Sequence, residues 1–488
     1  MIDPSDFNAI RSGIAAIPGD VSSDALGQHV AKVDEIYAPE RHAAALDPAT
    51  PIVLGSRGTG KSFWAGALGQ DETRQELHKA YPKLGLGKVQ VAFGYTGDVG
   101  GPQGVTAEHI NKSVPEDADI NIAMAFWWAT VLRAVSSTGG SQRKQVTELV
   151  ETGLDLEARE KILSDGDKKL LANGETLLIV YDALDTVAIS WPRRRRLTEA
   201  LLRVVWAMRA YRAIRLKLFL RPDQIDDDQL RYVELPKLST GAVRLEWTGS
   251  DLYGLLYARL ALSADVEANA AFAKLVTKLG IEKGTGDAIL ARRWILSHDP
   301  REQAHVMTVL SGSYMATGVN GYKKGKTYDW PVKHLADARS EVTPRSFIGL
   351  MIAAAKYGAP PGDRVITPEG IRHGLRAASK TRVDQLHQDF PWIKGVLAPL
   401  AGVLLPQAEA GVILVWQQGN TVQHLVEDAA IHKYLPPFPK EGQKTESDLL
   451  NALEKMGVIS RRKDGRIDMP DLFRVAAKLL KKGGTAPV

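Results

Sequence analysis

The chain has 488 residues, is 44% hydrophobic and 24% charged, and contains no cysteine. This length predicts about three domains, and the composition is that of ordinary globular proteins. The lack of cysteine excludes disulfides, thiolate metal sites and cysteine nucleophiles. No apolar run approaches the ~18–20 residues that span a bilayer, and the N-terminus lacks the order of a signal peptide. We therefore expect a cytoplasmic protein without membrane contacts. Its net charge of +5 does not by itself indicate nucleic acid.

The first strong signal is the glycine-rich segment 55–62, which has the spacing of a phosphate-binding P-loop. An apolar run at 51–54 precedes it and a helix-like stretch at 63–68 follows, as this motif requires. The glycines let backbone N–H groups turn toward phosphate oxygens, and the helix adds its positive end. Lys61 can reach the β- and γ-phosphates, and Ser62 can ligate Mg²⁺. The predicted nucleotide-binding residues are Gly55, Ser56, Arg57, Gly58, Thr59, Gly60, Lys61 and Ser62.

Between the P-loop and the next motif, the pattern predicts a strand at 88–93 and a glycine-rich surface turn at 97–104. An apolar helix follows at 120–135. This helix contains the adjacent pair Trp127 and Trp128, which cannot face the same way. We expect one of them in the core and the other against a neighbouring element.

A second motif lies at the end of the apolar, β-branched run 176–181, which is typical of a buried parallel strand. Ligands of open parallel sheets bind beyond the carboxyl ends of the strands, where Asp182 is expected. We predict that Asp182 holds Mg²⁺ and that Asp185 polarises the attacking water. In the alternative, each of these aspartates only caps a turn or helix.

The densest charge in the chain follows at residues 193–196. It consists of Arg193, Arg194, Arg195 and Arg196. Three interpretations compete: an arginine finger for a neighbouring subunit, a contact with nucleic-acid phosphates, or a solvated patch balanced by the acidic stretch 223–228.

A further strand is expected at 216–220, and Arg221 follows it directly. A cation at the tip of the strand next to the acidic motif can sense the γ-phosphate, and we assign Arg221 to that role. The alternative is a plain salt bridge to Asp223 or to the acidic run 226–228.

From about residue 246 the pattern is helical, with leucines at helical spacing between 252 and 262. The segment 318–328 interrupts it with glycines and three lysines, Lys323, Lys324 and Lys326, beside Tyr322 and Tyr328. Interleaved lysines and aromatics suit nucleic-acid contact, and a simple exposed loop is the alternative.

The last hundred residues contain an amphipathic helix at 445–456, a tight-turn signal at 464–465 and a second helical pattern at 470–480. This order suggests a winged helix. The residues Arg461, Arg462, Lys463 and Arg466 lie on the wing. They could meet DNA phosphates, or the module could serve an internal or protein contact.

Taken together, these segments resemble the bacterial STAND-type ATPases, which are related to the AAA+ and origin-recognition ATPases. The resemblance is carried by GSRGTGKS, LLIVYDALDT, KLFLRPD, RLEW and TPRSFI, and it covers roughly residues 30–390. It implies that Arg345 approaches the nucleotide from a helical lid, and that a winged helix can clamp the nucleotide internally. The family pattern usually has a glutamate where Thr186 stands, which puts fast hydrolysis in doubt.

We therefore expect an α/β fold, with a P-loop parallel sheet covered on both faces and followed by a helical lid and a helical, winged-helix-like region. The expected domains are 1–245, 246–385 and 386–488. The expected function is an ATP- and Mg²⁺-binding switch with slow hydrolysis, which controls its own assembly or a separate effector, as in bacterial antiphage systems. The alternatives are a loader or segregation ATPase that grips duplex DNA, and a nucleotide sensor that does not hydrolyse.

Overall fold

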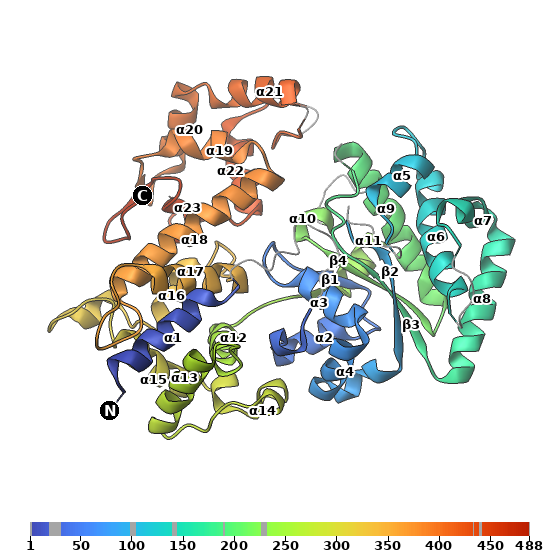
Figure 1. The fold of residues 1–488 in the computed structure, drawn as a ribbon. Helices are drawn as coiled ribbons and strands as arrows, with labels where there is room; N and C mark the ends of the chain where they lie inside the picture. Colours follow the sequence, from blue (N-terminus) through green and yellow to red (C-terminus); the bar gives the residue numbers. More distant parts are fainter. Residues whose placement is uncertain are drawn as a thin grey trace. The chain divides into compact units, whose positions relative to one another are not determined.

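The computed structural model describes residues 2–18, 31–97, 104–138, 144–188, 191–225, 232–432, 434–438 and 442–487. The chain divides into two compact units. The core unit comprises residues 20–246, and the helical unit combines residues 1–19 with residues 247–488 (Figure 1). Within the described residues, no helix combines the length and apolar character that a membrane span requires.

A five-stranded, fully parallel sheet forms the centre of the core unit. Its strands, in the order β2-β3-β4-β1-β5, are β2 (Val89–Tyr95), β3 (Thr176–Tyr181), β4 (Ile214–Leu220), β1 (Ile52–Leu54) and β5 (Val243–Arg244). The strands predicted at 51–54, 88–93, 176–181 and 216–220 are all present. Because β4 lies between β1 and β3, one strand separates the two motifs, and Arg221 follows the strand adjacent to the acidic motif.

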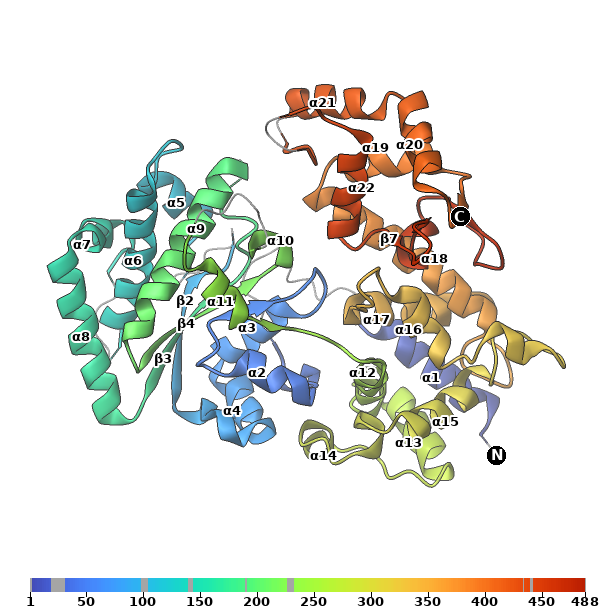
Figure 2. The ribbon, with the colours of Figure 1, turned by 180° about the vertical axis from the view of Figure 1, so that it is seen from behind.

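Helices cover both faces of this sheet, as predicted (Figures 1 and 2). The elements around it are α2 (Ala43–Leu46), α3 (Lys61–Gly69), α4 (Asp71–Ala80), α5 (Ala107–Ser113), α6 (Ile120–Ser136), α7 (Val150–Leu154), α8 (Leu156–Asn173), α9 (Trp191–Ala207), α10 (Pro222–Ile225) and α11 (Leu235–Thr240). Residues of β3 alternate between the two layers. Leu177, Ile179 and Tyr181 join the hydrophobic cluster of α6, α8 and α9, so the intervening residues face the other layer.

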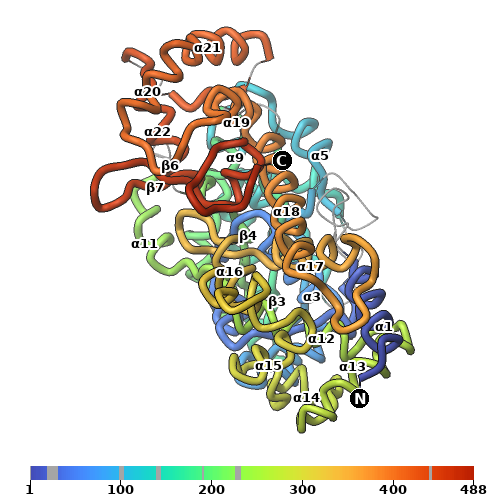
Figure 3. Tube along the Cα trace, turned by 90° about the vertical axis from the view of Figure 1, so that its left-hand side faces the viewer, coloured from blue at the N-terminus to red at the C-terminus, as the bar shows by residue number. Residues whose placement is uncertain are grey.

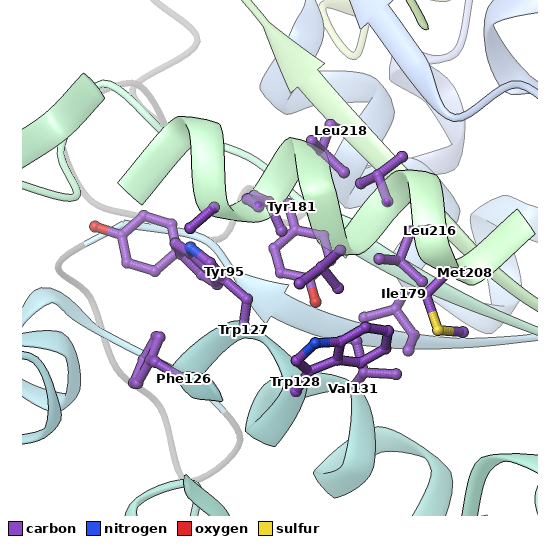
Figure 4. Close-up of a cluster of buried hydrophobic side chains, with 14 of the residues drawn as sticks. Tyr95, Phe126, Trp127, Trp128, Val131, Ile179, Tyr181, Met208, Leu216 and Leu218 are labelled. Carbon is purple, nitrogen blue, oxygen red and sulfur yellow. The ribbon is translucent and has the colours of Figure 1, made fainter. Parts of the chain in front are cut away.

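The tryptophan pair on α6 divides as expected. The Trp127 indole N–H donates to the Leu197 carbonyl oxygen at 2.9 Å, and its ring packs edge-on against Tyr95 and Tyr181 (Figure 4). Trp128 faces α8, where the Arg159 guanidinium lies 4.5 Å from the centroid of its ring. Both rings are therefore structural.

The N-terminal helix α1 (Pro4–Ala16) belongs to the helical unit, although the sequence placed it in the first domain with the P-loop. Its apolar face packs on α13 (Val266–Lys278) and α17 (Pro344–Lys356). The buried Arg11 guanidinium also donates to the carbonyl oxygens of Tyr357, Gly358 and Val365. Such contacts join residues some 350 positions apart, and local sequence cannot reveal them. The core unit is thus inserted between α1 and the rest of the helical unit.

The segment after residue 246 is helical, as predicted. Its helices up to residue 389 are α12 (Gly249–Ala261), α13, α14 (Gly286–Leu290), α15 (Pro300–Ser311), α16 (Asp329–Leu335), α17 and α18 (Pro368–Asp389). The long helix α18 packs along α17 and continues across the domain boundary predicted between 385 and 386.

The C-terminal part adds α19 (Ile393–Leu397), α20 (Glu409–Gln418), α21 (Thr421–His432), α22 (Glu446–Lys455), α23 (Asp471–Arg474) and the short strands β6 (Leu404–Leu405), β7 (Ser460–Arg461), β8 (Ile467–Asp468) and β9 (Leu480–Lys481). Figure 3 shows α22 beside α20. The amphipathic helix and the tight hairpin, β7 with β8, are present as predicted.

The helix predicted at 470–480 is wrong beyond Arg474. The chain turns there because the fully buried Arg474 guanidinium donates to the carbonyl oxygens of Leu479 and Thr485. Leu480 then pairs with Leu404 in a parallel bridge between β6 and β9.

Candidate functional site

The P-loop connects β1 to α3 and has a tightly fixed shape. Gly58 and Gly60 have φ angles of 86° and 100°, which side-chain-bearing residues rarely adopt. A Cβ on Gly55 would lie 2.4 Å from the Thr59 hydroxyl oxygen. That hydroxyl donates to the Ser56 carbonyl oxygen at 2.9 Å and closes the turn. The backbone conformation therefore requires glycine at 58 and 60, and the Thr59 side chain leaves no room for a Cβ at 55.

Lys61 is the first residue of α3, and its ammonium group folds back over the loop. Lys61 Nζ donates to the carbonyl oxygens of Gly55 at 2.9 Å and Ser56 at 3.3 Å. The charge is thus held in the curl of the loop, at the positive end of the helix. Phosphate oxygens would be stronger acceptors for this ammonium than the two carbonyls.

Asp182 lies directly beyond the carboxyl end of β3 and is 6% exposed. Its carboxylate accepts a hydrogen bond from the Ser62 hydroxyl. Its amide N–H donates to the Tyr95 carbonyl oxygen at 2.9 Å and extends the pairing of β3 with β2. The structure therefore brings together the two residues that the sequence assigned to Mg²⁺, although 120 positions separate them in the chain (182 − 62).

The environment of Asp182 suits a metal ligand. Burial raises the pKa of its carboxyl group, and the Ser62 hydrogen bond and the Lys61 ammonium offset that rise only in part. The next residue, Ala183, has a φ of 54°, and such strain in a residue other than glycine often marks a functional turn. A buried carboxylate with incomplete compensation is stabilised by a bound cation.

Asp185 and Arg221 lie at the ends of adjacent strands and face each other. The Arg221 guanidinium is 3.5 Å from an Asp185 carboxylate oxygen and 3.0 Å from one of Asp223. Burial alone would raise the pKa of Asp185, but the charges of Arg221 and Lys61 outweigh it and hold the pKa below its ordinary value. Arg221 thus forms the salt bridge to Asp223 that the sequence offered as an alternative, and it also contacts Asp185 of the acidic motif. The run 226–228 lies outside the described residues.

Thr186 stands where the family pattern has a glutamate. Its side chain forms hydrogen bonds that stabilise the turn. Its hydroxyl donates to the Ala183 carbonyl oxygen at 2.8 Å. Because a hydroxyl has a single proton, the 2.8 Å contact between Thr186 and the Tyr95 hydroxyl is donated by Tyr95. Among the side chains of this turn, the one available to polarise water is that of Asp185.

The arginine run lies in the first turns of α9 and contacts the core unit itself. Arg193 donates to the Val114 carbonyl oxygen at 2.7 Å and forms an ion pair with Glu116. Arg196 donates to the carbonyl oxygens of Glu116 at 3.1 Å and Ala118 at 2.7 Å.

Arg194 donates to the Ala188 carbonyl oxygen through two nitrogens, at 3.0 and 3.1 Å. Three of the four arginines therefore attach α9 to the loops beside it.

Sequence reasoning missed two residues of this unit. Tyr95 ends β2 and supports the Thr186 turn. Lys217, inside β4, is fully buried and donates to the carbonyl oxygens of Ala45, Asp47 and Thr50 at 2.8–2.9 Å. These carbonyls precede β1, so Lys217 holds the approach to the P-loop. The sequence did offer one signal for this role, because Lys217 is a charged residue inside an otherwise apolar predicted strand.

The remaining candidates belong to the helical unit. Arg345 is the second residue of α17, after the N-cap Thr343, whose hydroxyl accepts from the Ser346 amide at 3.2 Å. Its assignment to the nucleotide stays a prediction.

On the wing, Arg461 forms ion pairs with Glu409 and Glu454, and Arg466 pairs with Asp464 at 2.7 Å. Arg462 and Lys463 are exposed at its tip.

The wing module is docked on the helices before it. Asp471 of α23 pairs with His334 of α16, and the Ala476 amide donates to the Ser379 hydroxyl of α18 at 2.9 Å. The Ala338 amide donates to the Gly457 carbonyl oxygen at 2.9 Å, at the end of α22. These contacts join the wing module to the other helices of its own unit, and both interpretations of the module stay predictions.

Among the described residues, no cluster of three or more His, Cys, Asp or Glu side chains could hold a metal by itself. Mg²⁺ in nucleotide sites does not need one, because it takes one or two protein oxygens and completes its shell with water and phosphate. The Ser62 hydroxyl and the Asp182 carboxylate are such a set.

The core unit thus has the fold of a P-loop nucleotide-binding domain, with one strand inserted between the P-loop strand and the acidic-motif strand. No protein-family model matches the chain. No curated protein matches it either. Among solved structures, the chain is similar to the ORC2 protein of Aeropyrum pernix in its ADPNP and ADP complexes, with 13% identity and a TM-score of 0.32. The match covers 90% of this chain and 93% of that one. Similarity at this level carries no statement about function.

Proposed function

We propose that the chain binds ATP with Mg²⁺ in the core unit and uses it as a slowly hydrolysing molecular switch. The observation that carries this proposal is the buried Asp182 carboxylate at the end of β3, to which the Ser62 hydroxyl and the Lys61 ammonium both come close enough to lower the pKa of its carboxyl group, while that ammonium is held in the P-loop. A chance glycine turn would not bring these three groups to one edge of a parallel sheet.

The residues have distinct roles in this proposal. Lys61 exchanges its two carbonyl partners for β- and γ-phosphate oxygens, and the backbone N–H groups of the P-loop cradle the phosphates. Ser62 and Asp182 would hold Mg²⁺, which when bound neutralises charge on the phosphate oxygens. The choice of ATP over GTP follows the family resemblance, since the chain has no guanine-reading Asn-Lys-x-Asp segment.

Slow hydrolysis follows from the chemistry of the acidic turn. Asp185 is ionised at neutral pH and is the side chain there that can orient a water. Its ion pair with Arg221 competes with that task, and Thr186 supplies no carboxylate. Arg221 in turn touches the group that the γ-phosphate would approach, which suits a residue that reports nucleotide state.

The switch itself would act through the helical unit, to which the core unit is joined at both of its ends. Nucleotide binding would bias its arrangement, with Arg345 contributing from α17. The output would be assembly of several copies or control of a separate effector. A role in bacterial antiphage defence rests on the STAND resemblance alone.

The test combines ATP turnover with sedimentation. We expect slow turnover by the full chain and a loss of roughly 10²-fold in Asp185→Ala, the low end of what a general base contributes. Sedimentation should change when ATP and Mg²⁺ are added. Equal, near-zero turnover of both proteins would exclude hydrolysis, and identical sedimentation with and without ATP would exclude switching by assembly.

The duplex-DNA loader is the second candidate, because Arg462 and Lys463 are exposed at the tip of the wing beside Arg461 and Arg466, which form surface ion pairs. It makes a clear prediction of its own. If the wing grips duplex DNA, replacing Arg461, Arg462, Lys463 and Arg466 by alanine must weaken binding and reduce its salt dependence. Unchanged affinity and salt slope would remove this hypothesis.

A further inference from the structure

The segment 312–328, here named the basic loop, joins α15 to α16 and projects from the helical unit (Figure 2). It is a folded hairpin-like projection. The Met315 amide donates to the Gly325 carbonyl oxygen at 2.9 Å, and Tyr314 and Lys326 form an antiparallel bridge. A Cβ on Gly321 would lie 2.3 Å from a backbone oxygen on the opposite side of the hairpin, so the two sides are in close contact.

The groups at the outside of the basic loop are cationic, aromatic and exposed. Tyr314 is 41% and Tyr322 57% exposed, and Lys323, Lys324 and Lys326 are exposed as well. In the part of the chain that the structure describes, none of these three ammonium groups forms an ion pair. The basic loop contains no Asp or Glu, whereas 57 such residues in 488 would place about two in a segment of this length.

The aromatic residues of the segment divide into two classes. Tyr328 is structural: its ring stacks on Tyr253 at 4.3 Å, and its hydroxyl donates to Gln303 at 2.7 Å. Within the described residues, Tyr322 and Tyr314 have no such ring partner, and the Lys323 ammonium lies 5.8 Å from the ring centroid of Tyr322. Their exposure therefore has no explanation in the packing of the helical unit.

We propose that the basic loop is a contact site for a single-stranded polynucleotide. Tyr322 and Tyr314 would stack on unpaired bases, and Lys323, Lys324 and Lys326 would contact the phosphates between them. This combination of ring faces and a cationic track is what sequence-independent single-strand binding uses. A duplex hides its base faces, and an acidic peptide would use the lysines but leave both rings uncovered.

This site lies in a different unit from the P-loop, and the proposal holds whether or not ATP is hydrolysed. The test measures anisotropy of labelled dT20 and U20 with the full chain over a range of salt. We expect both strands to bind, and the triple variant Lys323→Gln, Lys324→Gln, Lys326→Gln to bind at least tenfold more weakly. Its salt slope should fall by about 2, from three contacts at ~0.7 each.

Stacking is tested separately with Tyr322→Ala. This variant should weaken binding about tenfold and leave the salt slope unchanged, because it removes a base contact and no charge. The matched control replaces Lys161, Lys168 and Lys169, three exposed lysines of α8, by glutamine and should bind as the wild type does. Retained ATP binding in every variant shows that the nucleotide site is intact.

Several results would overturn the proposal. Equal binding by the basic-loop and α8 variants would show that the loop is not the contact. Equal affinity for a 20-base-pair duplex would contradict the assignment to unpaired bases. Binding to anionic phospholipid vesicles without binding to either single strand would assign the loop to a membrane surface instead.

Discussion

The core unit and the basic loop both concentrate positive charge, but they use it in opposite ways. In the core unit, Lys61, Arg221 and Arg196 each have partners fixed by the fold, either loop carbonyls or carboxylates. In the basic loop, Lys323 and Lys324 project outward without an ion pair in the described part of the chain.

Under the two proposals made above, this difference would correspond to two kinds of ligand. Cations held in fixed geometry suit a small, highly charged ligand, because little ordering is needed when it binds. Exposed surface cations suit a polymer whose phosphates release counterions when they are neutralised. Density of charge in the sequence does not distinguish them, since the four consecutive arginines are the densest run and three of them serve the fold.

The largest expected effect tests whether the core cations bind phosphate. Lys61→Ala should weaken ATP binding about 100-fold or more, because it removes a charged donor from an enclosed site. Binding of a fluorescent ATP analogue would measure it. Lys79→Ala, an exposed lysine of α4, is the control and should bind normally. An unchanged affinity in Lys61→Ala would mean that the P-loop is not a nucleotide site.

The second effect tests whether the arginine run is structural. Arg196→Ala should lower the free energy of unfolding of the protein by about 2 kcal/mol, because two carbonyl groups lose their donor. Lys324→Ala in the basic loop should change it by less than about 0.5 kcal/mol. Urea denaturation measures the free energy of unfolding of both variants. Equal values would show that Arg196 contributes no more to stability than an exposed lysine of the basic loop.

A third effect concerns the buried cation Lys217. Burial lowers the pKa of its ammonium group from 10.5 to about 7. Between these pH values the unfolded chain binds more protons, so the free energy of unfolding should rise with pH, by at most about 1.4 kcal/mol per unit.

Lys217→Met should remove this rise, whereas Lys88→Met, at an exposed position, should retain it. Denaturation curves recorded from pH 7 to 10 would decide, and parallel profiles for all three proteins would contradict the assignment.

The smallest expected change in stability is an increase, whereas most substitutions of buried residues lower stability. Because burial raises the pKa of Asp182, its charge is penalised in the folded protein at neutral pH. Asp182→Asn should therefore stabilise the ligand-free protein slightly while abolishing Mg²⁺-dependent ATP binding.

The gain from Asp182→Asn should shrink as the pH falls, since the wild-type carboxyl then takes up its proton. Asp185→Asn is the matched control and should destabilise, because the pKa of Asp185 is lowered by Arg221. Thermal shift assays at pH 5 and pH 7.5 measure both signs, and destabilisation by Asp182→Asn would show that its charge is fully compensated.

Much of the core unit could be predicted from the sequence, because strands, turns and their motifs depend on local patterns. The P-loop required glycines at fixed spacing, and the apolar run before Asp182 indicated both a buried strand and the edge where its carboxylate would lie. The partners of individual cations could not be predicted. Arg221, Arg194 and Arg196 find theirs in segments that only the packed sheet and helices bring near.

The same reason explains the failures in the helical unit. Helical periodicity at 470–480 was present, but the buried Arg474 and the pairing of Leu480 with Leu404 overrode it. Nor could the sequence show that α1 packs on helices that follow the core unit. Arg11 and its carbonyl partners are separated in the sequence by the whole core unit, and only folding brings them together.

The sequence by itself determined the phosphate loop, the acidic strand end and the parallel sheet between them, since each follows from spacing and side-chain chemistry within a few residues. Only the tertiary structure decided which charges are available to a ligand. A cation's availability depends on the carbonyls and carboxylates that folding brings within hydrogen-bond reach. By that criterion Arg193, Arg194 and Arg196 are used by the fold, whereas the lysines of the basic loop form no ion pair with any residue that the structure describes.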